Sequence, residues 1–264
     1  MSRRSILIVV TLFAAITSAA YADEWKKAFT TTGRPEVRIT TNDASIEVRA
    51  TDRKDTEVRV ITKGIDIGSK KVRITENQSG DTISVEVHRS SHGLHISWNE
   101  ESTRVMVEVP RETNLDLHSS DGHISIDDVK GDLRLDTSDG HIDANRVDGK
   151  LHARTSDGHM TIDGRFDDLD LRTSDGHIDT AVRQGSVMSN DWSIQTGDGR
   201  VEVRLPETMN VDIDLHTGDG RVSSDVPLTM SGEMGRSDVH GKLNAGGFQL
   251  RVRTSDGSIH LGKI

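Results

Sequence analysis

Apolar and polar residues alternate with period two on both sides of a turn that recurs along most of the chain. Apolar residues stand six and four residues before the aspartate of each turn and three residues after it, as Leu133, Leu135 and Ile142 do around Asp139. This alternation predicts β-strands, so we expect an all-β protein. The turn is Ser or Thr, Ser or Gly, then Asp and Gly, and it occurs seven times, at Asp121 and Gly122, Asp139 and Gly140, Asp157 and Gly158, Asp175 and Gly176, Asp198 and Gly199, Asp219 and Gly220, and Asp256 and Gly257.

The turns are evenly spaced in the middle of the chain and more widely spaced after it. The four turns from Asp121 to Asp175 follow one another at a constant interval, and the intervals that end at Asp198, Asp219 and Asp256 are longer. We interpret the longer intervals as one coil with an insertion, one coil with a smaller insertion, and two coils of which one has lost its turn. Residues 41–44 (Thr-Asn-Asp-Ala) are a degenerate eighth copy.

Two architectures fit such a unit. The first is a β-solenoid or β-helix with coils of about 18 residues, stacked through parallel strands. The alternative is an antiparallel hairpin repeat or a sandwich, because Asp-Gly between alternating strands is also a hairpin signal. We favour the solenoid, because a regular repeat places like residues over like. Glycine-containing segments at residues 129–131, 147–149 and 184–185 predict a second corner in each coil.

Stacked coils bring the turn aspartates close together. Adjacent strands lie about 4.8 Å apart, where two carboxylates repel by about 0.9 kcal/mol in water. We therefore expect the carboxylates to be solvated or to cap their own turns as Asx groups, with capping favoured. The threonines two residues before each aspartate, such as Thr155, point inward in this register and predict a buried hydroxyl ladder.

Residues 1–22 are typical of a signal peptide. Arg3 and Arg4 precede an apolar run, and small residues stand at the two positions before Asp23 that a signal peptidase reads. The paired arginines also resemble a twin-arginine signal, and this alternative stays open. We expect residues 1–22 to be removed, residues 23–110 to form a divergent N-terminal β region, and residues 111–264 to form the regular solenoid. The protein would then be exported, to the periplasm or to the cell surface or medium, with no transmembrane segment in the mature chain.

Composition excludes several classes of protein. There is no cysteine, so disulfides and thiolate sites are excluded. The formal charge of -10 argues against a nucleic-acid partner, which would need a basic face. Aromatic residues make up only 3% of the chain, as suits a narrow core in which each coil stacks on a copy of itself. We expect most of those beyond the signal peptide to mark ends, inserts or irregular coils, and they are Trp25, Phe29, Trp98, Phe166, Trp192 and Phe248.

Four consecutive turns are followed by histidine, which predicts a column of imidazoles along one edge. Imidazole and carboxylate are suitable ligands for zinc, copper or nickel. We favour a solvated polar face as the explanation of the column, since Arg200, Arg221 and Ser258 fill the same position in other turns. Calcium is disfavoured, because each unit offers one acidic corner and too few oxygens. The candidate metal ligands are His123, His141, His159, His177, Asp143 and Asp179.

No motif of a known catalytic class is present. A nucleophile elbow, a phosphate loop and a zinc-protease helix are all absent from the sequence. Some β-helices cleave polysaccharides, but they need a long cleft made by extended loops. Only the inserts near residues 182–191 and 229–244 could supply one. We therefore expect no enzyme activity, no catalytic residues and no cofactor.

The chain resembles the bacterial putative-adhesin family of exported β-repeat proteins, a domain of unknown function. The resemblance rests on the alternation that ends in Val109-Pro110, on the repeated Thr-Ser-Asp-Gly-His-Ile turns, and on the glycine-rich segment 241–247 before the last turn. It covers residues 35–262 and implies a β-helical fold at the cell envelope and an adhesive role. The family supplies no catalytic residues to carry over.

These observations lead to one functional prediction and two alternatives. We expect an exported, non-enzymatic protein that contacts an envelope polymer or protein through its repeating polar face. The first alternative is a polysaccharide-active enzyme on the same fold. The second is a metal-binding or envelope-stress sensing protein.

Overall fold

Strands make up all the regular structure that the described residues contain, as the alternation predicts. The computed structural model describes residues 22–69, 71–90, 101–230 and 235–264. Within this part of the chain there is no helix long and apolar enough to cross a membrane. The strands are β1 (Ala22–Thr30), β2 (Glu36–Thr41), β3 (Ser45–Thr51), β4 (Asp55–Lys63), β5 (Val72–Ser79), β6 (Thr82–Arg89), β7 (Ser102–Pro110), β8 (Asn114–Ser119), β9 (Ile124–Asp127), β10 (Lys130–Asp136), β11 (Ile142–Arg154), β12 (Met160–Arg172), β13 (Ile178–Val182), β14 (Trp192–Asp198), β15 (Val201–Leu205), β16 (Val211–Asp219), β17 (Val222–Ser224), β18 (Thr229–Met230), β19 (Asp238–Leu243), β20 (Gln249–Asp256) and β21 (Ile259–Lys263).

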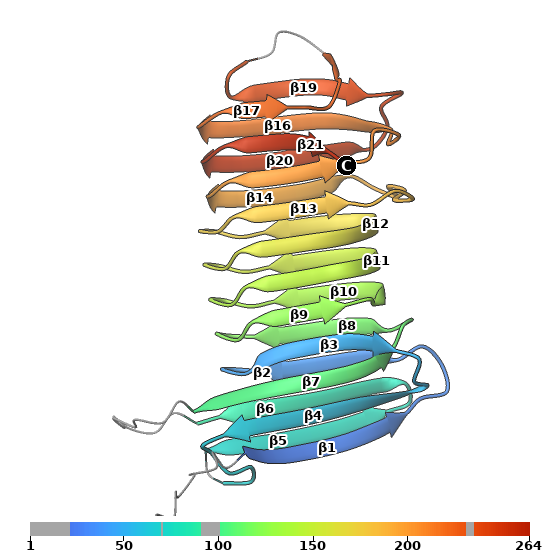
Figure 1. Cartoon of the computed structure of the whole chain (residues 1–264), viewed down its shortest axis with the longest axis vertical. Coiled ribbons are helices and arrows are strands. Elements are labelled where there is room, and N and C mark those ends of the chain that lie inside the picture. Colours follow the sequence, from blue (N-terminus) through green and yellow to red (C-terminus); the bar gives the residue numbers. More distant parts are fainter. Residues whose placement is uncertain (1–21, 70, 91–100, 231–234) are drawn as a thin grey trace, which may run out of the picture.

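Two ladders of parallel strands run along the molecule (Figure 1). The leading ladder holds the strands that precede the turns, in the order β6, β2, β8, β10, β11, β12, β14, β20 and β16. The trailing ladder holds the strands that follow the turns, in the order β7, β3, β9, β11, β12, β13, β15, β21 and β17. Strands β11 and β12 serve both ladders, because each begins in the trailing ladder and ends in the leading one.

Like residues lie over like in both ladders. Leu133 pairs with Leu115 on one side and Leu151 on the other, and Ile142 pairs with Ile124 and Met160. These side chains are at most 2% exposed, and they fill the space between the ladders. The predicted β-solenoid is therefore confirmed. The alternative of antiparallel hairpins is wrong for the regular coils, because a turn there joins strands of two different ladders.

The coils do not stack in the order of the sequence. The coil β2–β3 lies between the pair β6–β7 and the coil β8–β9. At the other end, the C-terminal coil β20–β21 lies between β14–β15 and β16–β17. The interpretation of the interval from Asp219 to Asp256 as two coils, one without its turn, is therefore wrong. In this interval the chain completes one coil, forms β18 and β19, and returns to insert the last coil one level back.

Antiparallel strands close both ends of the stack. At the N-terminal end β4 pairs with β7 and β1, and β5 pairs with β6. At the C-terminal end β19 pairs with β16 and β18. This closure limits the open strand edges that a stack of parallel coils would otherwise leave. Residues 1–21 of the predicted signal peptide lie outside the described residues, and Ala22 is the first residue of β1.

The aromatic residues mark irregular places, as predicted. Phe29 lies in the terminal strand β1 and Phe248 in the loop before β20. Trp192 follows the insert between β13 and β14, and its ring meets that of Phe166 in β12 edge to face at 6.3 Å. Trp192 also donates its indole N–H to the carbonyl oxygen of Asp167 at 3.2 Å. Trp98 lies outside the described residues.

Candidate functional site

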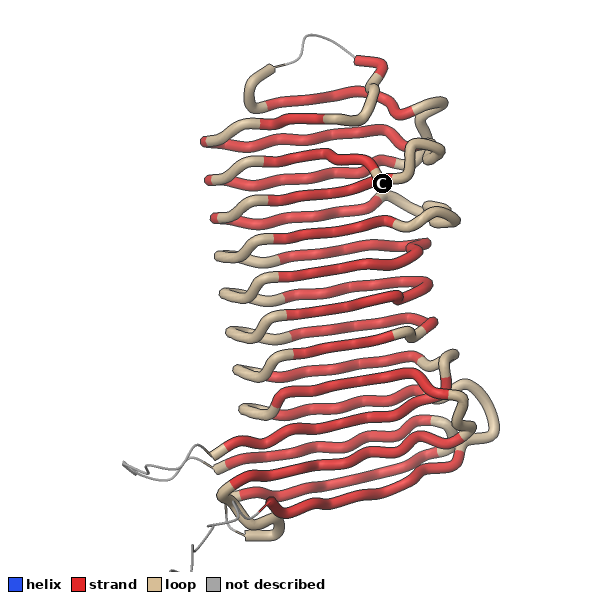
Figure 2. The backbone as a smooth tube through the Cα atoms, viewed as in Figure 1, coloured by secondary structure: helices blue, strands red, loops and turns tan. Residues whose placement is uncertain are grey.

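The Asp-Gly turns form one long edge of the stack, which we call the turn edge (Figure 2). It contains the turns at Asp43, Asp121, Asp139, Asp157, Asp175, Asp198, Asp256 and Asp219, in that order along the stack. The side chain of Asp43 is half-buried and the other seven are exposed. Burial and the neighbouring carboxylate of Asp121 raise the pKa of Asp43 above its ordinary value. The structure thus brings the predicted turn residues together into one solvated acidic ridge.

A threonine or serine hydroxyl, and not the aspartate, caps the turns at Asp43, Asp121, Asp139 and Asp157. The hydroxyl oxygen of Thr155 accepts the backbone N–H of Gly158 at 3.2 Å. The same hydroxyl lies 3.0 and 3.1 Å from the carbonyl oxygens of Ser138 and Gly140 in the previous coil, to which it donates. Thr137 and Thr173 repeat the contacts with the previous coil. The predicted buried hydroxyl ladder is confirmed, whereas the prediction that the carboxylates cap the turns is wrong.

The turn glycine is required by close stacking. A Cβ atom on Gly158 would lie 1.9 Å from the carbonyl oxygen of Gly140, and one on Gly140 would lie 2.1 Å from that of Gly122. Neither backbone has a left-handed φ, so the turn does not need glycine for its conformation. Any side chain here would push neighbouring coils apart. The Asp-Gly turn therefore recurs because the coils stack closely at the glycine, and not because the chain forms a hairpin there.

The histidine column lies beside the acidic ridge. The rings of His141, His159 and His177 are stacked, with centroids 5.0 and 4.9 Å apart and planes within 3° of parallel. Each Nδ1 accepts the backbone N–H of the equivalent residue in the next coil, His159, His177 and Arg200 respectively, at 3.0, 3.1 and 3.0 Å. Each of these rings therefore uses Nδ1 as a hydrogen-bond acceptor within the stack. The column therefore ties neighbouring coils together.

The remaining candidate ligands are paired. The ring of His123 stands perpendicular to that of His141, and its Nε2 lies 2.9 Å from the Oδ2 of Asp143. Asp179 lies 3.9 Å from the guanidinium of Arg200. In the described part of the chain, no three His, Asp or Glu side chains are grouped so that they could hold a metal ion. A metal at these residues stays a prediction. It would require the stacked rings to leave their amide partners, because the nitrogen lone pairs of parallel rings do not point at one common position.

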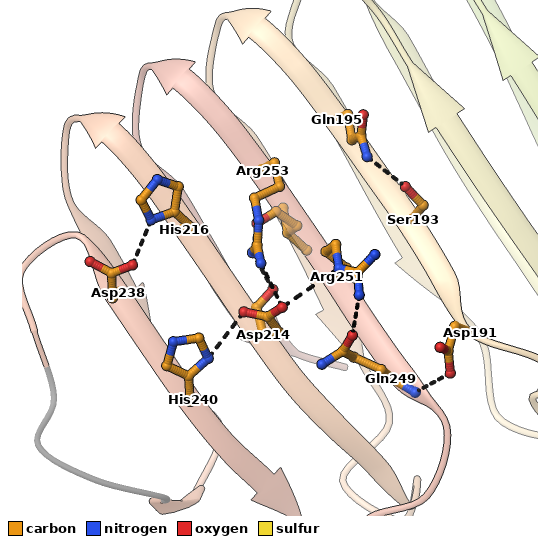
Figure 3. Close-up of polar contacts among 11 residues, drawn as sticks. Asp191, Ser193, Gln195, Asp214, His216, Asp238, His240, Gln249, Arg251 and Arg253 are labelled. Carbon is orange, nitrogen blue, oxygen red and sulfur yellow. Dashed lines mark hydrogen bonds and ion pairs between the residues drawn. The ribbon is translucent and has the colours of Figure 1, made fainter.

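A second polar cluster, which the sequence did not reveal, lies on the leading ladder near the C-terminal end (Figure 3). Asp214 is only 7% exposed although it faces outward. Its Oδ2 lies 2.5 Å from the Nη2 of Arg253 and 3.6 Å from the Nε of Arg251, and its Oδ1 lies 3.0 Å from the Nδ1 of His240. Beside it, a hydrogen bond from His216 to Asp238 at 2.5 Å holds the pKa of that carboxyl below its ordinary value.

This cluster joins three strands that come from distant parts of the sequence. Asp214 of β16 pairs across the sheet with Arg251 of β20 and with His240 of β19. Opposite charges in register stabilise neighbouring strands, and a buried carboxylate needs such partners. The sequence did contain a signal for this cluster, since Asp214 and Arg251 both stand five residues before a turn aspartate. It could not be used until the structure showed that those two coils are neighbours.

A shallow hollow of about 530 Å³ runs beside the turn edge on the leading ladder. Arg154, Arg172 and Gln195 line its far side, and Ser156 and Ser174 line the side next to the turns. It crosses three successive coils. The surface next to the acidic ridge is thus a groove along the stack, which suits an extended partner.

The sequence matches one known protein family over most of its length. The model of the Toastrack DUF4097 family matches residues 35–164, 113–189 and 163–262, which together cover most of the chain. The chain belongs to the Toastrack DUF4097 family. This membership confirms the resemblance to a domain family of unknown function, and the name Toastrack fits the stacked coils of Figure 1.

Solved structures similar to this Toastrack chain have low sequence identity to it. A putative cell adhesion protein from Clostridium sporogenes is 14% identical, with 92% of this chain and 100% of that chain covered and a TM-score of 0.43. A putative adhesin from Bacteroides fragilis is 9% identical, with 90% and 96% covered and a TM-score of 0.42. A putative lipid binding protein from Parabacteroides distasonis is 11% identical, with the same coverage and a TM-score of 0.39. No curated protein matches the chain in sequence.

Proposed function

We propose that this protein is an exported, non-enzymatic module of the cell envelope that adheres to a surface polymer or protein through its turn edge. The observation that carries this proposal is the row of seven exposed turn aspartates, one in each of seven stacked coils. The same group recurs at the spacing of neighbouring strands, about 4.8 Å. A partner with repeated basic or hydrogen-donating groups can make the same weak contact many times, and such contacts combine into avidity.

The rigidity of the coils supports a binding role. The threonine caps and the histidine bonds join each turn to the next through backbone atoms. The turn edge is therefore ordered before any partner arrives, which reduces the entropy lost on binding. Export is supported by the signal-like sequence of residues 1–22.

The contacts of the polar side chains support a role without catalysis. The stacked histidines use Nδ1 to accept backbone amides, and the threonine hydroxyls donate to backbone carbonyls. Asp214 is held by two arginines and a histidine. A general base or a nucleophile needs a group that can reach the substrate, and these groups are engaged in the fold.

The proposal is tested by binding of the mature chain, residues 23–264, to bacterial cells and to a carbohydrate array. Asp139→Asn, Asp157→Asn and Asp175→Asn combined should abolish most of the binding, because three adjacent charges of the ridge are removed. The matched control is Asp116→Asn, Asp132→Asn and Asp136→Asn combined, which makes the same charge change on the outer face of the leading ladder. Equal binding by the two triple variants would refute the turn edge as the adhesive surface.

The same preparation separates this proposal from the rival polysaccharide-active enzyme. Polysaccharides that bind the chain should release no soluble sugar during a long incubation. Progressive release of reducing ends would favour the enzyme. Export is checked by cell fractionation and by the N-terminus of the mature chain, which should be Asp23.

A further inference from the structure

Arginine side chains from successive coils meet at the corner opposite the turn edge. Arg111 lies between β7 and β8, Arg146 and Arg165 lie at the bends of β11 and β12, and Arg183 follows β13. Together they line one hollow of about 300 Å³, with Gln184, Val147 and two aspartates completing its wall. We call this site the arginine corner. The bends of β11 and β12 that carry two of its arginines lie on the side of the stack away from the turns (Figure 1).

Each guanidinium of the arginine corner is held in place by an aspartate of an adjoining coil. Arg111 lies 3.0 Å from Asp128, and Arg165 pairs with Asp148. Arg146 and Arg183 pair with Asp127 and Asp163, both at 2.5 Å. Ion pairs of this kind orient an arginine but use only part of its five N–H donors. The remaining donors are available to a ligand.

The guanidinium groups are the more exposed charges of the arginine corner. The side chains of the four arginines are 45–54% exposed, whereas those of the four paired aspartates are 21–33% exposed. Only two of those aspartates, Asp128 and Asp148, line the hollow itself. An incoming ligand therefore meets guanidinium groups before carboxylates. In a chain with a formal charge of -10, this surface is a place where an anion can bind favourably.

The backbone of the corner maintains this geometry. Asp128 and Arg146 adopt a left-handed φ of 61° and 52°, and the register between β11 and β12 shifts between Ala144 and Val147. These irregularities turn the chain from one ladder to the other. The left-handed φ of Arg146 lies at one of these irregular places, within the register shift of β11.

We propose that the arginine corner binds an acidic polysaccharide, with its anionic groups in the hollow between the guanidiniums. The planar guanidinium of arginine can bind two oxygens of one carboxylate or sulfate at once, which the compact ammonium of lysine cannot do. Coils repeat at about 4.8 Å, a distance close to the length of one sugar unit in an extended chain, so successive sugars can face successive arginines. A nucleic acid fits less well, because it needs a broad basic face without interleaved carboxylates.

The proposal does not depend on the turn edge, because the two sites lie on opposite sides of the stack. The test is the affinity of the mature chain for immobilised polygalacturonate and dextran sulfate, with neutral dextran as the uncharged control. The two acidic probes distinguish a carboxylate from a sulfate as the preferred group. We expect binding to at least one acidic probe, weaker at high salt, and none to neutral dextran.

Arg146→Gln with Arg165→Gln should weaken this binding by about tenfold or more, as the loss of two charged hydrogen-bonding groups implies. The matched control is Arg73→Gln with Arg134→Gln, which removes two exposed arginines from β5 and β10, away from the arginine corner and from the hollow beside the turn edge, and should bind as the unchanged chain does. If the corner variant fails to fold, Gln184→Glu places a negative charge at the hollow without touching an ion pair and should also weaken binding.

Three results would overturn the proposal. The first is binding of neutral dextran as strong as that of the acidic probes, and the second is an equal effect of the corner and control variants. The third is a corner variant whose self-association, measured by sedimentation, changes while its polysaccharide binding does not. The arginine corner would then contact the acidic turn edge of a second copy. These results concern the arginine corner alone, so a failure of the turn-edge proposal would not change them.

Discussion

At the scale of single residues, the hydroxyl residue two before the turn aspartate, a threonine in every turn but that of Asp121, holds the turn edge together. Its hydroxyl joins its own turn to the turn of the previous coil, and it is nearly buried, with Thr155 only 7% exposed. Two backbone carbonyls and one amide depend on this group. The exposed aspartate next to it makes no such contact within the described residues, so it is free for a partner.

Replacement of Thr155 with valine should destabilise the protein by about 1–3 kcal/mol, because the amide and carbonyls would lose their partner in a buried place. Valine has nearly the same shape, so packing is preserved. The measurement is urea unfolding followed by circular dichroism. Ser156→Ala is the control, since Ser156 is exposed and next in sequence. An equal midpoint for the two variants would show that the hydroxyl ladder contributes nothing.

At the scale of strands, carboxyl groups with a lowered pKa gather among the antiparallel strands at the N-terminal end. Lys26 of β1 lies 2.8 Å from Glu57 of β4, and this bond holds the pKa of Glu57 below its ordinary value. Backbone amides of Thr32 and Gly33 lower the pKa of Asp81, which lies between β5 and β6. Arg53 does the same for Asp55, and Lys71 and Arg89 for Glu101.

These lowered pKa values predict loss of stability at this end in acid. A carboxyl whose folded pKa lies below its unfolded value stabilises the fold above the unfolded value, about 4, and loses that contribution as the pH falls through the folded value. Amide hydrogen exchange in β1 and β4 should therefore accelerate below about pH 4, after correction for intrinsic rates, before exchange in β12 does. Lys26→Gln should reduce this pH dependence. Uniform acceleration along the stack would contradict the prediction.

The interleaved C-terminal coil controls the stability of one end of the whole molecule. Strand β20 pairs with both β14 and β16, and β21 pairs with both β15 and β17. The last residues of the chain therefore hold together coils that were completed earlier in the sequence. Solenoid stability is a sum of contacts between neighbours, so the loss of one internal coil removes two interfaces.

Deletion of residues 249–264 should expose the edges of β14 and β16, and with them the apolar row that includes Trp192 and Ile213. We expect residues 192–243 to lose protection from hydrogen exchange, while β8 to β12 keep theirs. Deletion of Lys263 and Ile264 alone is the control, because it leaves β20 and nearly all of β21 in place. Unchanged protection in β14 and β16 after the longer deletion would mean that the interleaved coil is dispensable.

The sequence by itself determined the strands and the faces they bury, and it favoured a parallel register without deciding it. Period-two alternation decides which side chains face inward, and the constant interval between turns brings Leu115, Leu133 and Leu151 into line. The same register correctly placed Thr155 inside and Asp157 at an exposed turn. It misassigned the cap, because a carboxylate and a hydroxyl can both accept a turn amide, and only the structure shows that Thr155 accepts the amide of Gly158.

Only the tertiary structure decided which coils are neighbours. The segment between Asp219 and Asp256 can form two coils or one coil and an antiparallel strand with the same local alternation, and nothing local distinguishes them. The cluster around Asp214 depends on that choice, since its partners lie on β19 and β20. The arginine corner depends on irregular bends at Asp128 and Arg146. The contacts between coils at these places follow from how the coils pack, and not from the alternation or the turn interval of the sequence.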